Sequence, residues 1–165
     1  MTEFNLEITV IQADYSNASH ASALLSLLDA YAQDVAGGGA PLSEFVKNHL
    51  VAELKARPSV FSVLAFDGEN PVGLVNCIEG FSTFACRPLV NLHDVVVLST
   101  HRGRRIGEQM LEHVEVIADR RGACKLTLEV LQNNRSAIAL YERVGFSGYQ
   151  LDPAMGRAQV LQKWL

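Results

Sequence analysis

The chain has 165 residues, a length that suggests one domain with room for a hydrophobic core, so we expect a single domain over residues 1–165. Hydrophobic residues make up 48% and charged residues 19%, a balance that excludes intrinsic disorder. The net charge of −4 argues against general nucleic-acid binding, and no apolar run approaches a membrane span. Three scattered cysteines without a C-x-x-C pair argue against a metal site, and the first residues lack a signal-peptide core. We therefore expect a cytoplasmic protein that binds no metal, nucleic acid or membrane.

The first third of the chain predicts one strand followed by two helices. Alternating apolar residues predict a strand over 4–12, and Asn17 or Ser19 is placed to cap an amphipathic helix. The run Gly-Gly-Gly-Ala-Pro at 37–41 ends that helix, and a second helix is expected over 43–56. The glycine loop is either a flexible connector or a wall of a binding site that moves.

The middle of the chain predicts a hairpin, a strand and a long helix. Apolar runs over 60–66 and 72–79 flank the turn sequence Asp-Gly-Glu-Asn-Pro, which is a strong hairpin signal. Residues 82–88 are polar and expected to be irregular, and a further strand covers 90–98. The apolar spacing over 104–121 fits one face of a helix, which ends in two arginines and a glycine.

The last part predicts a strand over 124–130, a helix over 134–144 and two closing strands over 146–151 and 157–164. The order β-α-α-β-β-β-α-β-α-β-β describes an α/β (α+β) fold. The strands on either side of the long helix form a parallel, right-handed unit, and the hairpins add antiparallel pairs. We expect one mixed, mostly antiparallel, twisted sheet of about 6–7 strands with helices on both faces.

A strand, a short loop and a helix meet at residues 95–107, and this stretch is the main functional signal. The loop at 102–107 reads R-G-R-R-I-G and so places glycine and three arginines where the helix starts. The N–H groups of a first helical turn lack intrahelical partners and lie at the positive end of the helix dipole. The loop is therefore either a site for a diphosphate or an ordinary basic helix start. Neither a P-loop nor a G-x-G-x-x-G fingerprint fits its spacing.

Two segments carry a resemblance to a known family. Residues 102–107 resemble the [Q/R]-x-x-G-x-[G/A] signature of the GCN5-related N-acetyltransferases, the GNAT family, with Arg105 in place of the middle glycine. Residues 134–146, N-R-S-A-I-A-L-Y-E-R-V-G-F, are similar to the family segment N-x-x-A-x-x-[L/F]-Y-x-x-x-G-F at every marked position. The resemblance implies a GNAT-like fold and acetyl-coenzyme A (acetyl-CoA) as co-substrate. The cofactor-binding residues that it implies are Val95, Val96, Val97, Arg102, Gly103, Arg104, Arg105, Ile106, Gly107 and Asn134.

Three residues are candidates for the chemistry. Tyr141 matches the tyrosine that in the family often protonates the departing thiolate, although it could simply pack its helix on the sheet. Asp94 matches an acidic residue of many relatives, and the adjacent His93 titrates near neutrality, so either residue or water could take the proton of an amine. Neighbouring strand residues point to opposite faces, so we expect only one to reach the acceptor, and we favour Asp94. Tyr31 and Asp34 are acceptor-side candidates.

The function that the resemblance implies is N-acetyl transfer, in which a primary amine attacks acetyl-CoA directly without an acyl-enzyme. The alternative is a non-catalytic acyl-CoA-binding sensor or subunit of a complex. The sequence does not identify the amine acceptor. Because members of the family often dimerise, a homodimer is one option for the assembly.

Overall fold

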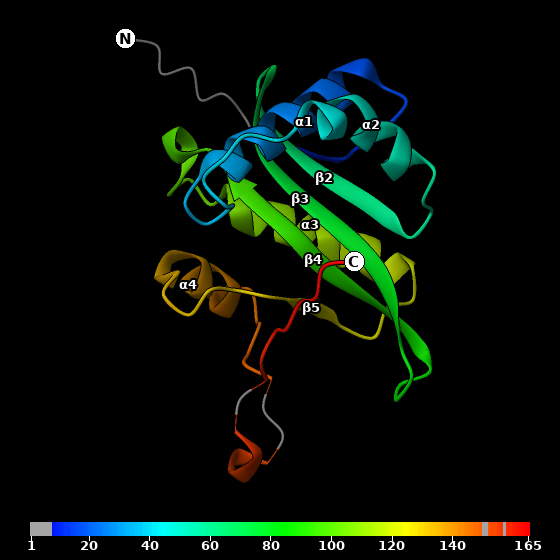
Figure 1. The fold of residues 1–165 in the computed structure, drawn as a ribbon, viewed down its shortest axis with the longest axis vertical. Helices are drawn as coiled ribbons and strands as arrows, with labels where there is room; N and C mark the ends of the chain where they lie inside the picture. The colour runs from blue at the N-terminus through cyan, green and yellow to red at the C-terminus, as the bar shows by residue number, and fades with distance from the viewer. Residues whose placement is uncertain (1–7, 150–151, 157) are drawn as a thin grey trace.

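The computed structural model describes residues 8–149, 152–156 and 158–165. Its five strands form one sheet in the order β1-β2-β3-β4-β5 (Figure 1). Neighbouring strands are antiparallel from β1 to β4, and β5 lies parallel to β4. The elements in chain order are β1 (Ile8–Gln12), α1 (Ala18–Gln33), α2 (Glu44–Lys55), β2 (Val60–Asp67), β3 (Asn70–Ser82), β4 (Arg87–Val97), the 3₁₀ turn η1 (Ser99–His101), α3 (Ile106–Arg120), β5 (Leu126–Leu128), α4 (Arg135–Arg143) and the 3₁₀ turn η2 (Pro153–Met155).

Helices cover both faces of the sheet, as the sequence predicts. The central strands β2 and β3 are buried on both faces, which explains why their sequences are nearly continuous apolar runs. On one face, α1 packs Ala23, Leu24 and Leu27 against the sheet, and α2 lies beside it (Figure 1). On the other face, the amphipathic helix α3 buries its apolar side, and Tyr141 of α4 joins the same cluster.

The predicted parallel unit around the long helix is confirmed. The chain leaves β4, forms α3 and returns as β5, which pairs in parallel with β4 over Val90–Leu92 and Leu126–Leu128. Two parallel strands require such a crossover, because a tight turn cannot connect them. The sheet is therefore mixed and mostly antiparallel.

Two expectations about strands are wrong. Within the described residues the sheet has five strands rather than six or seven, because 146–149 and 158–164 form no strand. Residues 150, 151 and 157, which belong to the same predicted strands, lie outside the described residues. The apolar side chains of this last segment are exposed, Trp164 by 87%, and a strand-like sequence without a surface to pack on gains little from pairing.

The second error concerns residues 82–88, which are not irregular throughout. Strand β3 continues to Ser82 and β4 already begins at Arg87, so the two form a long hairpin with its turn at 83–86. The first predicted strand is described from Ile8 onward, and residues 1–7 lie outside the described part of the chain. No helix within the described residues is long and apolar enough to cross a membrane.

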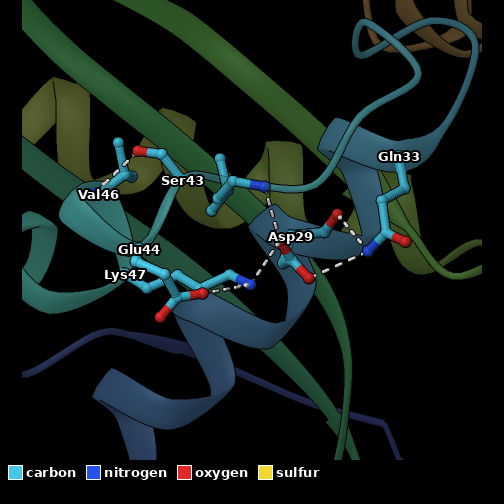
Figure 2. A network of polar contacts seen from close by, with 7 residues as sticks. Asp29, Gln33, Ser43, Glu44, Val46 and Lys47 are labelled. Carbon is cyan, nitrogen blue, oxygen red and sulfur yellow. Dashed lines mark hydrogen bonds and ion pairs between the residues drawn. The ribbon is translucent and has the colours of Figure 1, made fainter.

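A polar network at Asp29 joins α1 to the start of α2 (Figure 2). One oxygen of its carboxylate, Oδ1, accepts a hydrogen bond from the N–H of Leu42 at 2.8 Å and lies 3.7 Å from Nζ of Lys47. The other, Oδ2, accepts from Nε2 of Gln33 at 3.0 Å. Ser43 caps α2, as predicted, by accepting from the N–H of a residue in its first turn. The far end of the glycine-rich loop is therefore fixed to α1.

We expect Leu24→Ala to lower the free energy of unfolding by about 2–5 kcal/mol, because the side chain is fully buried between α1 and the sheet. Urea denaturation measures this loss. Val35→Ala, at a side chain that is 95% exposed, is the matched control and should change the free energy by less than about 0.5 kcal/mol. Equal effects of the two changes would contradict the packing described here.

Candidate active site

A cleft opens where β4 and β5 stop pairing. The pairing register passes from Asn76 opposite Asp94 to Cys77 opposite Leu92, so His93 is an extra residue that forms a β-bulge in β4. The last residue of β4 that pairs with β5 is Leu92. From the bulge onward, one edge of β4 has no neighbouring strand among the described residues. Backbone groups on this edge are therefore available to a ligand.

The cleft has a volume of about 870 Å³ and gathers most of the predicted site. Residues 95–97 of β4 form one side, and α4 contributes Tyr141 and its N-cap Asn134. Tyr31 and Asp34, at the end of α1, form the opposite wall. The two motifs lie about thirty residues apart in the sequence, and the acceptor-side candidates lie near the start of the chain. The structure brings all of them to one cleft.

The loop between β4 and α3 presents its backbone N–H groups beside this cleft. The N–H groups of residues 103–108 form no hydrogen bond to any described residue. The sequence predicted that the long helix starts at Arg104, but it starts at Ile106. The reason is that Arg105 adopts a left-handed conformation with φ of 61°. That conformation costs a residue with a side chain about 1–2 kcal/mol, which explains why the family motif has glycine there. Unpaired N–H groups at a helix start suit an anion.

The three arginines of the loop are not free charges, contrary to the simplest interpretation of the motif. Each one lies next to a carboxylate that its position in the sequence does not reveal. The pairs are Arg102 with Asp34 at 3.6 Å, Arg104 with Asp67 at 2.7 Å and Arg105 with Glu108 at 3.1 Å. Only the pair of Arg104 involves a buried carboxylate, and the side chains of Arg102 and Arg105 are well exposed beside their partners. The backbone N–H groups add to the charge that these arginines offer to an anion.

Gly107 lets α3 approach α4 closely. A Cβ atom at this position would lie 2.7 Å from Cδ2 of Leu140, which is closer than such atoms normally come. Asn134 caps α4, as predicted, because its side chain accepts from the N–H of Ala137 at 3.3 Å. The two motifs are thus in direct contact, and the cap residue is placed at the cleft.

Tyr141 is both a packing residue and a residue of the cleft. Its side chain is 8% exposed and packs edge-on against Phe146, with ring centroids 5.9 Å apart. Burial and then the neighbouring Tyr31 raise the pKa of Tyr141 to about 12. The phenol therefore stays protonated at neutral pH and can donate a hydrogen bond into the cleft.

Asp94 and His93 do not line the cleft itself, but they directly precede Val95, which does. Burial first, and then the charges of Asp94 and Asp34, raise the pKa of Tyr31, so both carboxylates act on that phenol. The two candidate bases at the bulge, Asp94 and His93, differ in their exposure to solvent. Asp94 is half-buried and His93 is exposed.

A polar chain that the sequence analysis missed leads across the sheet to Asp94. The amide Nδ2 of Asn76 donates to Oδ2 of Asp94 at 3.0 Å, and its Oδ1 accepts from Oγ of Ser62 at 2.6 Å. The same Oγ lies 2.8 Å from the hydroxyl of Tyr15. Asn76 and Ser62 are buried, and their place within apolar strands was the only sequence signal for them. The network fixes the orientation of the carboxylate.

Comparison with known proteins identifies the family of the chain. The sequence model of the Acetyltransferase (GNAT) family matches residues 34–146. The chain belongs to the GNAT family. The match includes both motifs and ends at Phe146, the last residue of the second one. The GNAT family inferred from residues 102–107 and 134–146 is therefore confirmed.

Individual relatives carry acetyltransferase names. Streptothricin acetyltransferase from Streptomyces lavendulae is 36% identical over 87 residues, which cover 51% of this chain and 46% of that enzyme. The uncharacterized N-acetyltransferase YhfO from Bacillus subtilis (strain 168) is 28% identical and covers 79% of this chain and 86% of its own. This GNAT chain spans under half the length of the streptothricin enzyme.

A solved structure supports the fold. The crystal structure of a probable acetyltransferase has a TM-score of 0.79 and 20% identity, and the match covers 94% of this chain and 98% of that one. At that identity the similarity establishes the fold alone. The GNAT-like architecture expected from the order of the elements is confirmed, with the strand number corrected to five.

The raised pKa of Tyr141 gives a prediction for stability at alkaline pH. An unfolded tyrosine has a pKa of about 10, so the fold favours the protonated phenol, and this contribution is complete below pH 10. It is lost as the pH rises from about 10 towards 12. Tyr141→Phe should therefore lose less stability between pH 9 and pH 11 than the unchanged protein in urea denaturation. Identical pH dependence of the two proteins would contradict the assigned environment.

Proposed function

We propose that this chain is an N-acetyltransferase that moves the acetyl group of acetyl-CoA to a primary amine by direct attack. The observation that carries the proposal is the row of unpartnered N–H groups at 103–108, beside a cleft that also contains Tyr141. A diphosphate at this helix start and a thioester farther along the cleft match the order of these groups in acetyl-CoA. Membership of the GNAT family supports the same donor.

The proposed cofactor contacts follow the shape of the cleft. The diphosphate accepts hydrogen bonds from the N–H groups of Gly103, Arg104, Arg105, Ile106 and Gly107, with Arg102 beside them. The pantetheine arm lies along residues 95–97, whose free strand edge offers backbone donors and acceptors. Asn134 borders the same path from the side of α4. No metal takes part in the proposed reaction.

The chemistry needs a neutral amine and a thiolate that can leave. A lysine-type amine has a pKa of about 10.4, so a base must take its proton, and we assign this role to Asp94, directly or through water. The nitrogen then forms a bond to the thioester carbon, and the carbon–sulfur bond breaks. The thiol pKa is near 8.5, so proton transfer from a phenol with a pKa of about 12 is uphill. Tyr141 therefore acts as a hydrogen-bond donor to the charge that builds on sulfur, and the departing thiolate then takes a proton from water.

The acceptor enters from the wall formed by the end of α1. Tyr31, Asp34 and the exposed Val35 line this side of the cleft. The name of the Streptomyces relative gives streptothricin as its acceptor, so streptothricin joins small amines, antibiotics and protein N-termini in the set to be screened. A cytoplasmic location and a homodimer stay predictions from the sequence.

Release of thiol from acetyl-CoA with a panel of amines tests the proposal. Enzyme-dependent release with at least one amine is the expected result. Coenzyme A binding by calorimetry without turnover for any amine would favour the alternative, a non-catalytic acyl-CoA-binding sensor or subunit. Absence of coenzyme A binding at millimolar concentrations would contradict both functions.

We expect Tyr141→Phe to lower kcat at least about tenfold, because the variant keeps the aromatic ring but loses the hydroxyl that donates the hydrogen bond. The dissociation constant for acetyl-CoA should stay within about twofold, since the change leaves the proposed backbone contacts to the diphosphate in place. Steady-state kinetics and calorimetry measure the two quantities. An unchanged kcat would remove Tyr141 from the reaction.

The roles of the two candidate bases can be separated by substitution. Asp94→Asn should lower kcat/KM about tenfold or more, because the amide that replaces the carboxylate cannot take a proton. His93→Gln, at the exposed bulge position, should change it by less than about threefold. The opposite order of effects would move the role of the base to His93.

A further inference from the structure

A buried carboxylate lies behind the loop that borders the cleft. Asp67 is the last residue of β2, and its side chain is only 9% exposed. Its Oδ2 accepts a hydrogen bond from Nη1 of Arg104 at 2.7 Å and lies 3.4 Å from Nε2 of His101. Neither Asp67 nor Arg104 is part of the cleft lining. The carboxylate therefore lies behind the cleft lining, and of its two partners His101 also lines the cleft.

The two partners of Asp67 hold the loop at two points. His101 ends η1, the first turn after β4, and Arg104 directly precedes the left-handed residue before α3. A single carboxylate oxygen thus connects the beginning and the end of the segment 101–104. The start of the loop is also tied to the sheet, because the N–H of Leu98 donates to the carbonyl of Val72 at 2.9 Å.

The other contacts of the loop side chains are weaker constraints. Arg105 is paired with Glu108, but its side chain is 78% exposed, and Arg102 lies 3.6 Å from Asp34 with both side chains well exposed. Exposed pairs of this kind contribute little, typically about 0–1 kcal/mol. Arg102 also donates to the carbonyl of Val97 at 3.1 Å. The buried contact to Asp67 is therefore the main fixed point between the loop and the hairpin β2–β3.

The second oxygen of the carboxylate shows that this contact is retained at a cost. Oδ1 of Asp67 is buried and has no hydrogen-bond partner among the described residues. An unsatisfied buried oxygen opposes folding, and an apolar residue at this turn would avoid it. A buried ion pair of this kind is weak evidence for a gain in stability, which leaves room for a role in the loop that it contacts.

We propose that Asp67 is a positioning residue of the diphosphate loop. Through His101 and Arg104 it holds residues 101–104 in the one shape that directs the N–H groups of 103–108 to the cleft. The proposal rests on the proposed function, because it takes acetyl-CoA as the ligand of the loop. In this proposal the side chain of Arg104 binds Asp67 and not the phosphate, so Arg104 contacts the phosphate through its backbone N–H alone.

The sign of one substitution separates positioning from simple electrostatics. Asp67 carries a negative charge near the site of a diphosphate, so its removal by Asp67→Asn would strengthen binding if charge alone mattered. If Asp67 positions the loop, the same change weakens binding, because the neutral amide no longer attracts both Arg104 and His101 by charge. We expect coenzyme A to bind about tenfold more weakly to Asp67→Asn in calorimetry. Unchanged or tighter binding would overturn the inference.

The matched control is Glu53→Gln. Glu53 also pairs with an arginine, Arg57, but on the exposed surface of α2. This change should leave coenzyme A binding within about twofold of the unchanged protein. If the two variants lose the same affinity, the effect is not specific to the loop and the inference fails.

A shortened donor distinguishes loop positioning from general damage to the fold. S-acetylpantetheine has the thioester but no diphosphate, so its kcat/KM should be the same for Asp67→Asn and the unchanged protein, while that of acetyl-CoA falls about tenfold. Equal losses with both donors would overturn the inference. If the unchanged protein turned over neither donor but bound coenzyme A, the proposed catalysis would fail and the binding comparison would still decide the role of Asp67.

Hydrogen exchange provides a readout that needs no ligand. In Asp67→Asn without coenzyme A, the hydrogen-bonded amides of Leu98, His101 and Gln109, which flank the loop, should exchange at least about fivefold faster, because the loop samples other shapes. The amides of α2 serve as the internal reference and should be unchanged. Unaltered exchange at these three amides would overturn the inference even if activity fell.

Discussion

The site depends on the short parallel pairing of β4 with β5. Two parallel strands joined by a helix are held side by side only as long as both remain extended, and here the pairing ends at Leu92 and Leu128. The bulge at His93 then changes the direction of β4. The same divergence exposes a strand edge and brings the start of α3 to the head of the cleft. The two features needed to bind an extended, anionic molecule therefore arise from one interruption of the sheet.

The electrostatics of the site come mainly from the backbone. Each arginine of the loop has a carboxylate neighbour, and Glu108 is shared between Arg105 and Arg143, whose hydrogen bond holds the pKa of this carboxyl below its ordinary value. The arginines therefore help to fix the shape of the loop as well as adding positive charge to it. What the loop offers to an anion is a set of N–H groups at the positive end of a helix. A mildly acidic protein can thus provide an anion site without a basic patch.

The parts of the structure that follow from local patterns could be predicted from the sequence. Apolar periodicity located both helices of the site, and Asn17, Ser43 and Asn134 cap helices as their side chains suggest. Long-range contacts could not be predicted, because no local pattern shows that Asp67, in a hairpin, meets the loop after β4. The closing strands over 146–151 and 157–164 were predicted from apolar alternation, but that pattern does not reveal whether a surface exists to receive them.

The network at Asp29 has a consequence for the size of the acceptor. Its hydrogen bond from Leu42 fixes one end of the segment 35–41, and the pair of Asp34 with Arg102 holds the other. Between them, Gly38 and Gly39 adopt backbone conformations with positive φ that most residues avoid. The segment is also held to the end of α1, because the N–H groups of Gly37 and Gly39 donate to the carbonyl of Asp34. Since Val35 and Ala36 line the cleft, the space for an acceptor on this side is bounded by a backbone turn that is anchored at both ends.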